Sequence, residues 1–295
     1  MKEENKYINL ILGHSGFIGH NLEKYLKLTS SNQVMGHSLP NLDLTKGNDL
    51  KLLNSYLHED VNLIILAGIK RQFGDTLETF KINISMIENL AQILAIKKLR
   101  RVIFMSSAAV YGEETTNLEI SEKTNVNPTS YYGIGKFTSE CLLKKFSITP
   151  CIFLRPPLVY GEGDKNHTYG PTLFTEAAIN SEEIQLWGDG SELREFLYIK
   201  DLCEIINILI KIDEFPEGPV NIVSGVSHSF LDILDILIKQ GIKVKYKSRV
   251  RSKIKSDNIF IASKIKSILP SNFKFTSLES GLVKYYQNLL IKNGI

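Results

Sequence analysis

Cysteine is scarce in this chain, with three residues among 295. Cys141, Cys151 and Cys203 are odd in number and far apart, and no Cys-x-x-Cys motif occurs. This excludes a disulfide framework and a cysteine-based zinc site. Each cysteine is expected to be a small buried hydrophobic residue rather than a nucleophile.

Long apolar runs and a strong net charge are also missing. The apolar run 7–12 is too short for the core of a signal sequence, and no run approaches the roughly 18 apolar residues of a membrane helix. A net charge of only +3 gives no electrostatic case for binding nucleic acid or anionic membrane. The lysine-rich segment 239–255 is expected to be a solvated or substrate-facing loop. We therefore predict a cytoplasmic protein without nucleic-acid or membrane partners.

The chain does contain a regular alternation of short apolar runs and amphipathic patterns. The runs indicate buried strands and the patterns indicate helices. The expected strands are 7–13, 33–36, 62–68, 101–107 and 151–156, and the expected helices are 17–28, 48–59, 76–98, 131–147, 171–180, 200–212, 229–239 and 277–291. The alternation predicts an α/β fold, a Rossmann-type doubly wound parallel sheet with a smaller C-terminal substrate-binding part.

A glycine-rich turn joins the first expected strand to the first expected helix. Gly13, Gly16 and Gly19 are spaced as Gly-x-x-Gly-x-x-Gly, which permits a tight turn and presents the free N–H groups of a helix N-terminus to phosphate. A turn used only for packing is the alternative. The position at the start of an alternating chain favours dinucleotide binding, in which we include Ser15, Phe17 and Ile18.

The end of the second expected strand bears on the choice of dinucleotide. His37 and Ser38 stand there, where an acidic residue normally binds the adenosine ribose hydroxyls. The small Ser38 leaves room for a 2′-phosphate, to which His37 could donate a hydrogen bond. This favours NADP(H) over NAD(H), although a strand that ends elsewhere would explain the missing acid equally well.

The two parts of the chain differ in regularity. Residues 1–160 are predicted to form the NAD(P)-binding Rossmann domain. Residues 161–295 are predicted to be mainly the substrate-binding part, interleaved with that domain, and 201–222 is expected to return to the sheet.

Three residues have the chemistry for carbonyl–alcohol interconversion. Ser107 follows the strand run 101–107, and hydroxyls at the carboxyl end of such a strand lie at the ligand crevice. Tyr132 and Lys136 lie one helical turn apart. A serine can hold the substrate oxygen and a tyrosine can exchange its proton, while a lysine cation lowers the phenol pKa from about 10. Tyr131 would instead face Gly135, so Tyr132 is the expected acid/base.

With these residues in place, the chain resembles the extended short-chain dehydrogenase/reductases of the nucleotide-sugar epimerase/dehydratase family. The resemblance runs almost from end to end. It is carried by GHSGFIG, LAGIK, INISMIENL, SSAAVYG, YYGIGK, RPPLVYGEGD and WGDGSELREFLYIKDL, in this order.

The resemblance implies roles for individual residues. Ser107, Tyr132 and Lys136 would be catalytic. Asp43 and Leu44 would meet adenine, and the remaining cofactor contacts would come from Ala67, Gly68, Lys70, Asn83, Ser106, Pro156 and Pro157. Arg194 would hold the substrate diphosphate, because a guanidinium matches phosphate geometry. An ion pair of Arg194 with Glu192 or Glu195 is the alternative. Leu158 stands where many relatives carry asparagine.

The resemblance also narrows the reaction. Dehydratases of this family carry an Asp-Glu pair directly after the active-site hydroxyl, where this chain has Ala108 and Ala109. Methyl groups cannot move protons, so dehydration is disfavoured, and decarboxylation is disfavoured because its glutamate is absent as well. Two kinds of enzyme acting at C4 of a nucleoside-diphosphate sugar remain. One is a 4-ketoreductase of a deoxysugar pathway, and the other is an NAD-dependent 4-epimerase of the UDP-glucose or UDP-N-acetylhexosamine type. The missing strand-end acid favours the ketoreductase.

Two other functions and one oligomeric state are also possible from the sequence. A catalytically silent dinucleotide sensor is opposed by the intact serine, tyrosine and lysine. A reductase of non-nucleotide carbonyls is opposed by Arg194 and its surroundings. A homodimer through helices 76–98 and 131–147 is an expectation from the resemblance, although the chain's own core could equally cover their apolar faces.

Overall fold

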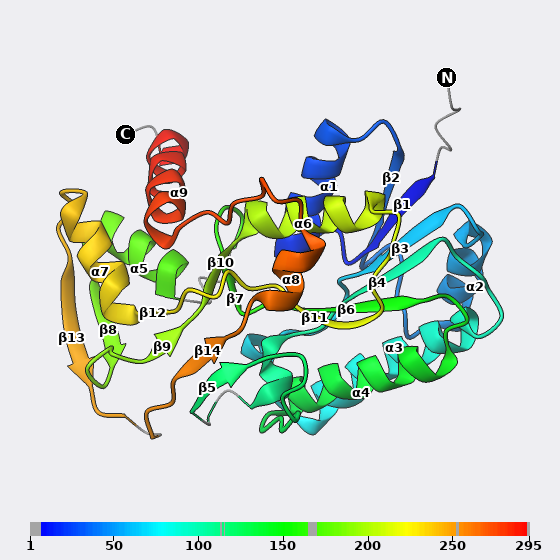
Figure 1. The fold of residues 1–295 in the computed structure, drawn as a ribbon, viewed down its shortest axis with the longest axis horizontal. Helices are drawn as coiled ribbons and strands as arrows, with labels where there is room; N and C mark the ends of the chain where they lie inside the picture. The colour runs from blue at the N-terminus through cyan, green and yellow to red at the C-terminus, as the bar shows by residue number, and fades with distance from the viewer. Residues whose placement is uncertain (1–6, 113, 115, 165–169, 252–253, 294–295) are drawn as a thin grey trace. The chain divides into compact units, whose positions relative to one another are not determined.

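The computed structural model confirms the predicted α/β fold (Figure 1). It describes residues 7–112, 114, 116–164, 170–251 and 254–293. The chain divides into two compact units, each built from several segments. The sheet unit comprises Met1–Gly112, Val126–Arg155 and Cys203–Val220, and the second unit comprises Glu113–Asn125, Pro156–Leu202 and Asn221–Ile295.

A six-stranded sheet organises the sheet unit, in the order β11-β6-β4-β3-β1-β2. Parallel pairings join β2, β1, β3, β4 and β6. The strands are β1 (Ile8–Leu12), β2 (Gln33–His37), β3 (Val61–Ile65), β4 (Arg101–Met105), β6 (Cys151–Arg155) and β11 (Gly218–Asn221). Every residue of β3, β4 and β6 is buried. Central parallel strands are covered on both faces, which explains why these segments read as continuous apolar runs.

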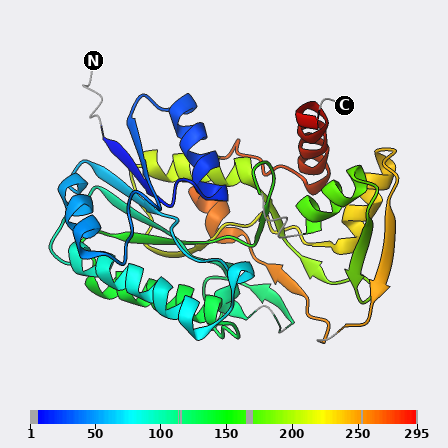
Figure 2. The ribbon, with the colours of Figure 1, turned by 180° about the vertical axis from the view of Figure 1, so that it is seen from behind.

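Helices cover both faces of this sheet. Figures 1 and 2 show α3 and α4 side by side on one face, and α1 and α6 on the other. The bounds are α1 (Phe17–Thr29), α2 (Gly47–Tyr56), α3 (Leu77–Leu94), α4 (Tyr131–Phe146) and α6 (Ile199–Lys211), with short 3₁₀ turns η1 (Arg71–Phe73) and η2 (Ala108–Tyr111). The apolar core of this unit includes Leu10, Leu63, Leu90, Phe104 and Phe153, each at most 3% exposed.

In the residues that the structure describes, the second unit consists of short two-stranded pairings and several helices. The strands pair as β10 with β7, β12 with β9, β13 with β8 and β14 with β5. Their bounds are β5 (Asn117–Ile120), β7 (Leu158–Tyr160), β8 (Glu183–Trp187), β9 (Leu193–Arg194), β10 (Phe196–Tyr198), β12 (His228–Ser229), β13 (Lys245–Arg249) and β14 (Asn258–Phe260). The helices are α5 (Gly170–Ile179), α7 (Phe230–Lys239), α8 (Ser263–Ile268) and α9 (Leu278–Asn293). Figure 2 shows α5 and α7 beside the β8–β13 pair.

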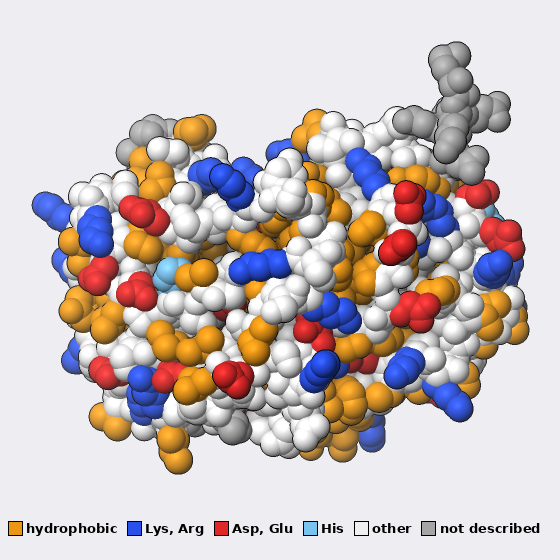
Figure 3. Space-filling model, in the orientation of Figure 1, with side chains coloured by type: hydrophobic (Ala, Val, Ile, Leu, Met, Phe, Trp, Pro, Cys, Tyr) orange, Lys and Arg blue, Asp and Glu red, His pale blue; other side chains and the backbone are white. Residues whose placement is uncertain are grey.

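The surface carries charges of both signs. On the face shown in Figure 3, lysine and arginine side chains are interspersed with aspartate and glutamate. Within the part of the chain that the structure describes, no helix has the length and apolar character needed to cross a membrane.

Candidate active site

The glycine-rich turn between β1 and α1 is shaped by two close backbone approaches. Gly13 has a φ of +89°, and a Cβ there would lie 2.7 Å from the backbone nitrogen of Ala67. A Cβ at Gly19 would lie 2.2 Å from the carbonyl oxygen of Gly13. Packing within the chain therefore requires glycine at both positions.

Gly16 is different, because the protein itself leaves room for a side chain there. A Cβ at Gly16 would meet only the carbonyl oxygen of Gly13, at 3.4 Å. Gly16 is also the N-cap of α1, and no side chain caps the helix at this position. A bare helix N-terminus beside open space is the cradle that a pyrophosphate needs, so this turn fits a dinucleotide.

A cavity of about 820 Å³ opens at this turn. Its volume lies in the upper part of the range of roughly 300–1,000 Å³ typical of small-molecule sites. Fifteen of the residues predicted for the site line it: Gly13, Ser15, Gly16, Phe17, Ile18, Gly19, His37, Ser38, Asp43, Leu44, Ala67, Gly68, Lys70, Tyr132 and Lys136. The carboxyl ends of the parallel strands thus bring together segments that are distant in sequence.

The other predicted residues are not among those lining this cavity. Asn83 lines a small second cavity with Tyr132 and Lys136. Its side-chain oxygen accepts a hydrogen bond from the Ile69 N–H at 2.7 Å, and its side-chain nitrogen donates to the Ile69 carbonyl oxygen at 3.0 Å. The hydroxyl of Ser106 donates to the carboxylate of Glu140. The remaining four are Ser107, at the end of β4, and Pro156, Pro157 and Arg194, which belong to the second unit.

His37 packs against an aromatic ring and lies near a second histidine. Its ring stacks on that of Tyr56, with centroids 5.0 Å apart and an angle of 18° between the planes. Burial, together with the neighbouring His14, lowers the pKa of His37 below its ordinary value of 6.5. At neutral pH this imidazole is therefore uncharged and adds no cation beside Ser38.

Tyr132 and Lys136 occupy one face of α4, as their spacing predicts. Ser130 caps the helix through a 3.0 Å bond from the Gly133 N–H. The ammonium of Lys136 lies 5.7 Å from the centroid of the Tyr132 ring and donates to the carbonyl oxygen of Met105 at 2.6 Å. Burial lowers the pKa of Lys136 to about 8, against the opposing effect of Glu140. The neighbouring Tyr131 is 41% exposed.

Two further contacts fix the surroundings of Tyr132. The carboxylate of Asp75 accepts a 2.9 Å hydrogen bond from the Tyr132 N–H and lies 3.7 Å from the guanidinium of Arg71. The oxygen of Ser107 accepts a 3.1 Å bond from the Ala109 N–H and so caps η2. These bonds hold the start of α4 and the end of β4 in place.

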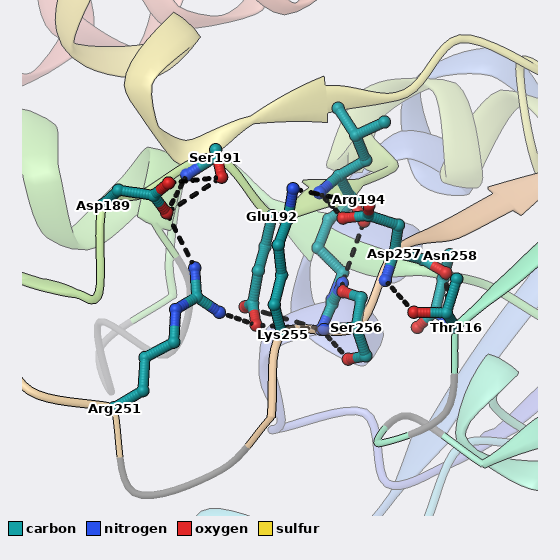
Figure 4. Close-up of polar contacts among 11 residues, drawn as sticks. Thr116, Asp189, Ser191, Glu192, Arg194, Arg251, Lys255, Ser256, Asp257 and Asn258 are labelled. Atoms are coloured by element: carbon teal, nitrogen blue, oxygen red, sulfur yellow. Dashed lines mark hydrogen bonds and ion pairs between the residues drawn. The ribbon is translucent and has the colours of Figure 1, made fainter.

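In the second unit, Arg194 belongs to a cluster of charged groups (Figure 4). Its guanidinium donates to the backbone carbonyls of Leu193 and Ser256 and to the Ser256 hydroxyl. It also lies 3.7 Å from the carboxylate of Glu192, so the expected ion-pair alternative is formed. Arg251 pairs with the same Glu192 and, at 3.0 Å, with Asp189. Two guanidinium groups thus share one carboxylate.

Sequence reasoning missed three of these residues. Glu140 continues the four-residue spacing of Tyr132 and Lys136, a signal present in the sequence. Asp75 and Arg251 carry no such signal, because each meets its partner across a long stretch of chain. The sequence separation is 57 for Asp75 and Tyr132 and 59 for Arg251 and Glu192.

The fold, the glycine turn and the Tyr132–Lys136 pair are those of an extended short-chain dehydrogenase/reductase. The NAD dependent epimerase/dehydratase family matches residues 9–222. The chain belongs to this family and is an enzyme of nucleotide-sugar metabolism.

Individual relatives are distant in sequence. GDP-6-deoxy-D-talose 4-dehydrogenase from Aggregatibacter actinomycetemcomitans is 25% identical, with 97% of this chain and 99% of that protein covered. UDP-glucose 4-epimerase from Mycoplasma genitalium is 29% identical, with 71% and 68% covered. The structure of UDP-glucuronic acid 4-epimerase from Bacillus cereus, in complex with UDP-glucuronic acid and NAD, superimposes with a TM-score of 0.78 at 22% identity and covers 98% of this chain and 100% of its own.

Proposed function

We propose that this protein is an NAD-dependent 4-epimerase of a UDP-sugar. The observation that carries the proposal is the Tyr132–Lys136 pair in a dinucleotide-sized cavity. The two positions directly after Ser107 add no further acid or base, because they hold Ala108 and Ala109. Relatives and structural neighbours named as UDP-sugar 4-epimerases support it over the ketoreductase favoured by the sequence.

The choice of NAD has a physical basis as well. We expected NADP(H) because an acidic residue is missing at the end of the second strand, where the small Ser38 leaves room for a 2′-phosphate and His37 could donate to it. The depressed pKa of His37 leaves its ring neutral, and a neutral imidazole gives a 2′-phosphate no charge compensation. The comparisons do not support the NADP(H) preference either, since the Bacillus cereus neighbour is described with NAD.

The chain's residues divide the chemistry at C4 among them. Tyr132 would take the proton from the 4-hydroxyl of the sugar. It would return the proton after the keto sugar has rotated to present its other face. Lys136 would stabilise the phenolate form of Tyr132 through its charge. Ser107 would hold the 4-oxygen by a hydrogen bond. When bound, NAD supplies the acceptor and donor of the C4 hydride.

Arg194 and Arg251 are proposed to hold the diphosphate of the sugar nucleotide. Arginine binds phosphate oxygens in a forked geometry, and these two side chains already share the carboxylate of Glu192. A diphosphate carries the same kind of oxygen pairs and would replace part of these contacts.

A 4-ketoreductase remains the second candidate, on one specific observation. The relative that this chain matches over 99% of its length is named a 4-dehydrogenase of a GDP-deoxysugar. A reductase would use the same Ser107, Tyr132 and Lys136, so these residues do not separate the two reactions. The homodimer and the cytoplasmic location stay predictions.

The test of the proposal is the nucleotide that the purified protein carries. We expect NAD to be released on denaturation and UDP-glucose to be converted into its C4 epimer without added cofactor. A protein that purifies empty, binds NADPH much more tightly than NADH and oxidises NADPH only with a 4-keto-sugar nucleotide as hydride acceptor would be a ketoreductase instead.

Gly16→Ala should weaken dinucleotide binding with little effect on folding. The new methyl group would occupy the cradle at the N-terminus of α1, while its nearest protein atom lies 3.4 Å away. We expect the Kd for NAD, measured by calorimetry on protein from which the bound nucleotide has been removed, to rise about tenfold or more, equivalent to ~1.4 kcal/mol. Gly47→Ala is the matched control, because a Cβ there meets nothing within 4 Å. Equal affinities in the two variants would contradict the assignment of the cradle.

The turnover number should fall on the alkaline side of neutrality. Lys136 acts through its positive charge, and its pKa is lowered to about 8. A group whose folded-state pKa is depressed loses its proton as pH rises through that value, so the cation disappears above about pH 8. We expect an alkaline limb of kcat near that pH, measured in buffers of constant ionic strength. A kcat that stays level to about pH 10 would show that the charge of Lys136 is not required.

A further inference from the structure

The cation of Lys136 is not alone on its helix. Glu140 lies one turn further along α4, so that residues 132, 136 and 140 share a face. Glu140 is 4% exposed, and its negative charge acts to raise the pKa of Lys136. No step of the proposed C4 chemistry uses this buried carboxylate.

The carboxylate is locked in position from two strands. From β6, Arg155 donates through Nε at 2.9 Å to one oxygen and through a terminal nitrogen at 2.5 Å to the other. From the end of β4, the hydroxyl of Ser106 donates to the first oxygen. Arg155 itself is 3% exposed and also donates to the Tyr111 hydroxyl at 2.8 Å. Glu140 therefore has little freedom to turn away from its helix face.

Three consecutive residues at the end of β4 connect this carboxylate to the reaction. The carbonyl oxygen of Met105 accepts a hydrogen bond from the Lys136 ammonium, and the hydroxyl of Ser106 donates to Glu140. Ser107 is the residue proposed to bind the 4-oxygen of the sugar. One short backbone segment thus sets the positions of the lysine, its carboxylate and the serine.

We propose that Glu140 is a positioning residue that, held by Arg155 and Ser106, keeps Lys136 in its charged form beside Tyr132. The inference rests on the proposed function, in which Tyr132 acts as acid and base. Glu140 touches neither substrate nor cofactor in this role and acts only through Lys136.

The physical reason lies in how the Tyr132–Lys136 pair shares protons. After losing one proton, the pair is either a charged lysine with a phenolate or a neutral lysine with a phenol, and only the first can act as a base. A nearby negative charge favours the charged lysine. Without it, desolvation would favour the neutral lysine, and the base would be lost although both residues remain.

The charges that face Lys136 come from several elements. On α4 they are Glu140 and, once ionised, Tyr132; β4 contributes the Met105 carbonyl and the face of the Phe104 ring, 4.9 Å from the ammonium. From β6 comes Arg155, whose cation opposes Glu140. The amide of Asn83 on α3 lies at the same small cavity. Among these groups Glu140 supplies the negative charge that does not depend on Tyr132.

The experiment measures the pKa of Lys136 directly. Lysine labelled with carbon-13 at Cε is introduced into a Tyr132→Phe protein, which removes the coupled proton, and the Lys136 signal, assigned with Lys136→Met, is followed against pH. We expect Glu140→Gln to lower this pKa by about one unit or more. Glu140→Asp keeps the charge and should leave the pKa nearly unchanged. Ser139→Ala removes a buried, uncharged hydroxyl from the same helix, which donates to the Gly135 carbonyl oxygen at 2.7 Å. It is the control for a local change that removes no charge.

Each outcome bears on the proposal. The proposal would be overturned if Glu140→Gln leaves the pKa of Lys136 unchanged, or if Ser139→Ala shifts it equally. Glu140 would then serve only in a structural ion pair with Arg155. If Glu140→Gln does not fold, the double variant Glu140→Met, Arg155→Met replaces the pair by apolar groups of similar size and should still lower the pKa.

Kinetics of the otherwise wild-type protein then separate this inference from the function. Glu140→Gln should move both limbs of the kcat profile to lower pH and reduce its maximum, whereas Glu140→Asp should leave the limbs in place. A Lys136 pKa that responds in a protein inactive on UDP-sugars would refute the proposed substrate but not the role of Glu140. If the protein turns over a UDP-sugar but the pKa of Lys136 does not change in Glu140→Gln, the proposed substrate stands and the role of Glu140 is refuted.

Discussion

Tyr132→Phe is expected to lower kcat about 1,000-fold and to leave NAD binding intact. The change removes one oxygen from a side chain that lines the cavity, and general acid–base groups contribute typically about 10²–10⁴-fold. The ring, which the Lys136 ammonium approaches to 5.7 Å, stays in place. The measurement is steady-state turnover of UDP-glucose beside calorimetric titration with NAD.

The adjacent tyrosine provides the control. Tyr131→Phe makes the same chemical change one residue earlier, at a side chain that is 41% exposed. Its kcat should stay within about twofold of wild type, as expected for a surface change away from the reacting atoms. If Tyr131→Phe were the inactive variant and Tyr132→Phe the active one, the assignment of the acid/base would be wrong.

Arg155→Met is expected to lower the free energy of unfolding by about 3–5 kcal/mol. Removing one partner of a buried ion pair leaves the other charge without compensation, which costs about that much. The partner is Glu140, 2.5 Å away, and both side chains are at most 5% exposed. Methionine fills most of the vacated volume, so the loss would reflect charge and hydrogen bonding more than a cavity. Chemical denaturation followed by circular dichroism measures it.

Lys27→Met tests whether burial is the cause. Lys27 and Glu23 form an ion pair at 2.8 Å, but the lysine side chain is 58% exposed. Exposed pairs one helical turn apart contribute about 0.3–0.5 kcal/mol, so this variant should be almost as stable as wild type. If both variants lose a similar free energy of unfolding, burial does not make the Arg155–Glu140 pair more important for stability than an exposed pair.

The sequence predicted the sheet unit closely, because its signals are local and repeated. The five expected strands all occur, with the run 62–68 observed as β3 (Val61–Ile65) and 101–107 as β4 (Arg101–Met105). The sixth strand, β11 (Gly218–Asn221), lies in the segment 201–222 that was expected to return to the sheet, but its own bounds were not predicted. It is four residues long and includes a proline, which is too little for an apolar run to stand out.

The paired strands of the second unit escaped prediction for a different reason. β13 (Lys245–Arg249) is exposed at every residue and rich in basic side chains, so it shows no alternation between buried and solvated positions. The segment was expected to be a loop. Its strand character comes from pairing with β8 (Glu183–Trp187), a contact distant in sequence.

The candidate site was predictable where the residues lie on one turn or one helix face. Gly13, Gly16 and Gly19, and the pair Tyr132 and Lys136, fall in this group. What local spacing could not reveal was the environment of a side chain. Ser38 suggested room for a phosphate, whereas the stacking of His37 on Tyr56 became visible only once β2 and α2 were placed together.

The most direct test of a 4-epimerase uses UDP-glucose that carries deuterium at C4. The purified protein is incubated with this substrate without added cofactor, and the products are examined by proton NMR. We expect UDP-galactose with deuterium still at C4, because the label leaves and returns to the same carbon within one turnover. Loss of the label from C4 would contradict a 4-epimerase. UDP-glucose left unchanged by a protein that oxidises NADPH when given a 4-keto-sugar nucleotide would identify a reductase instead.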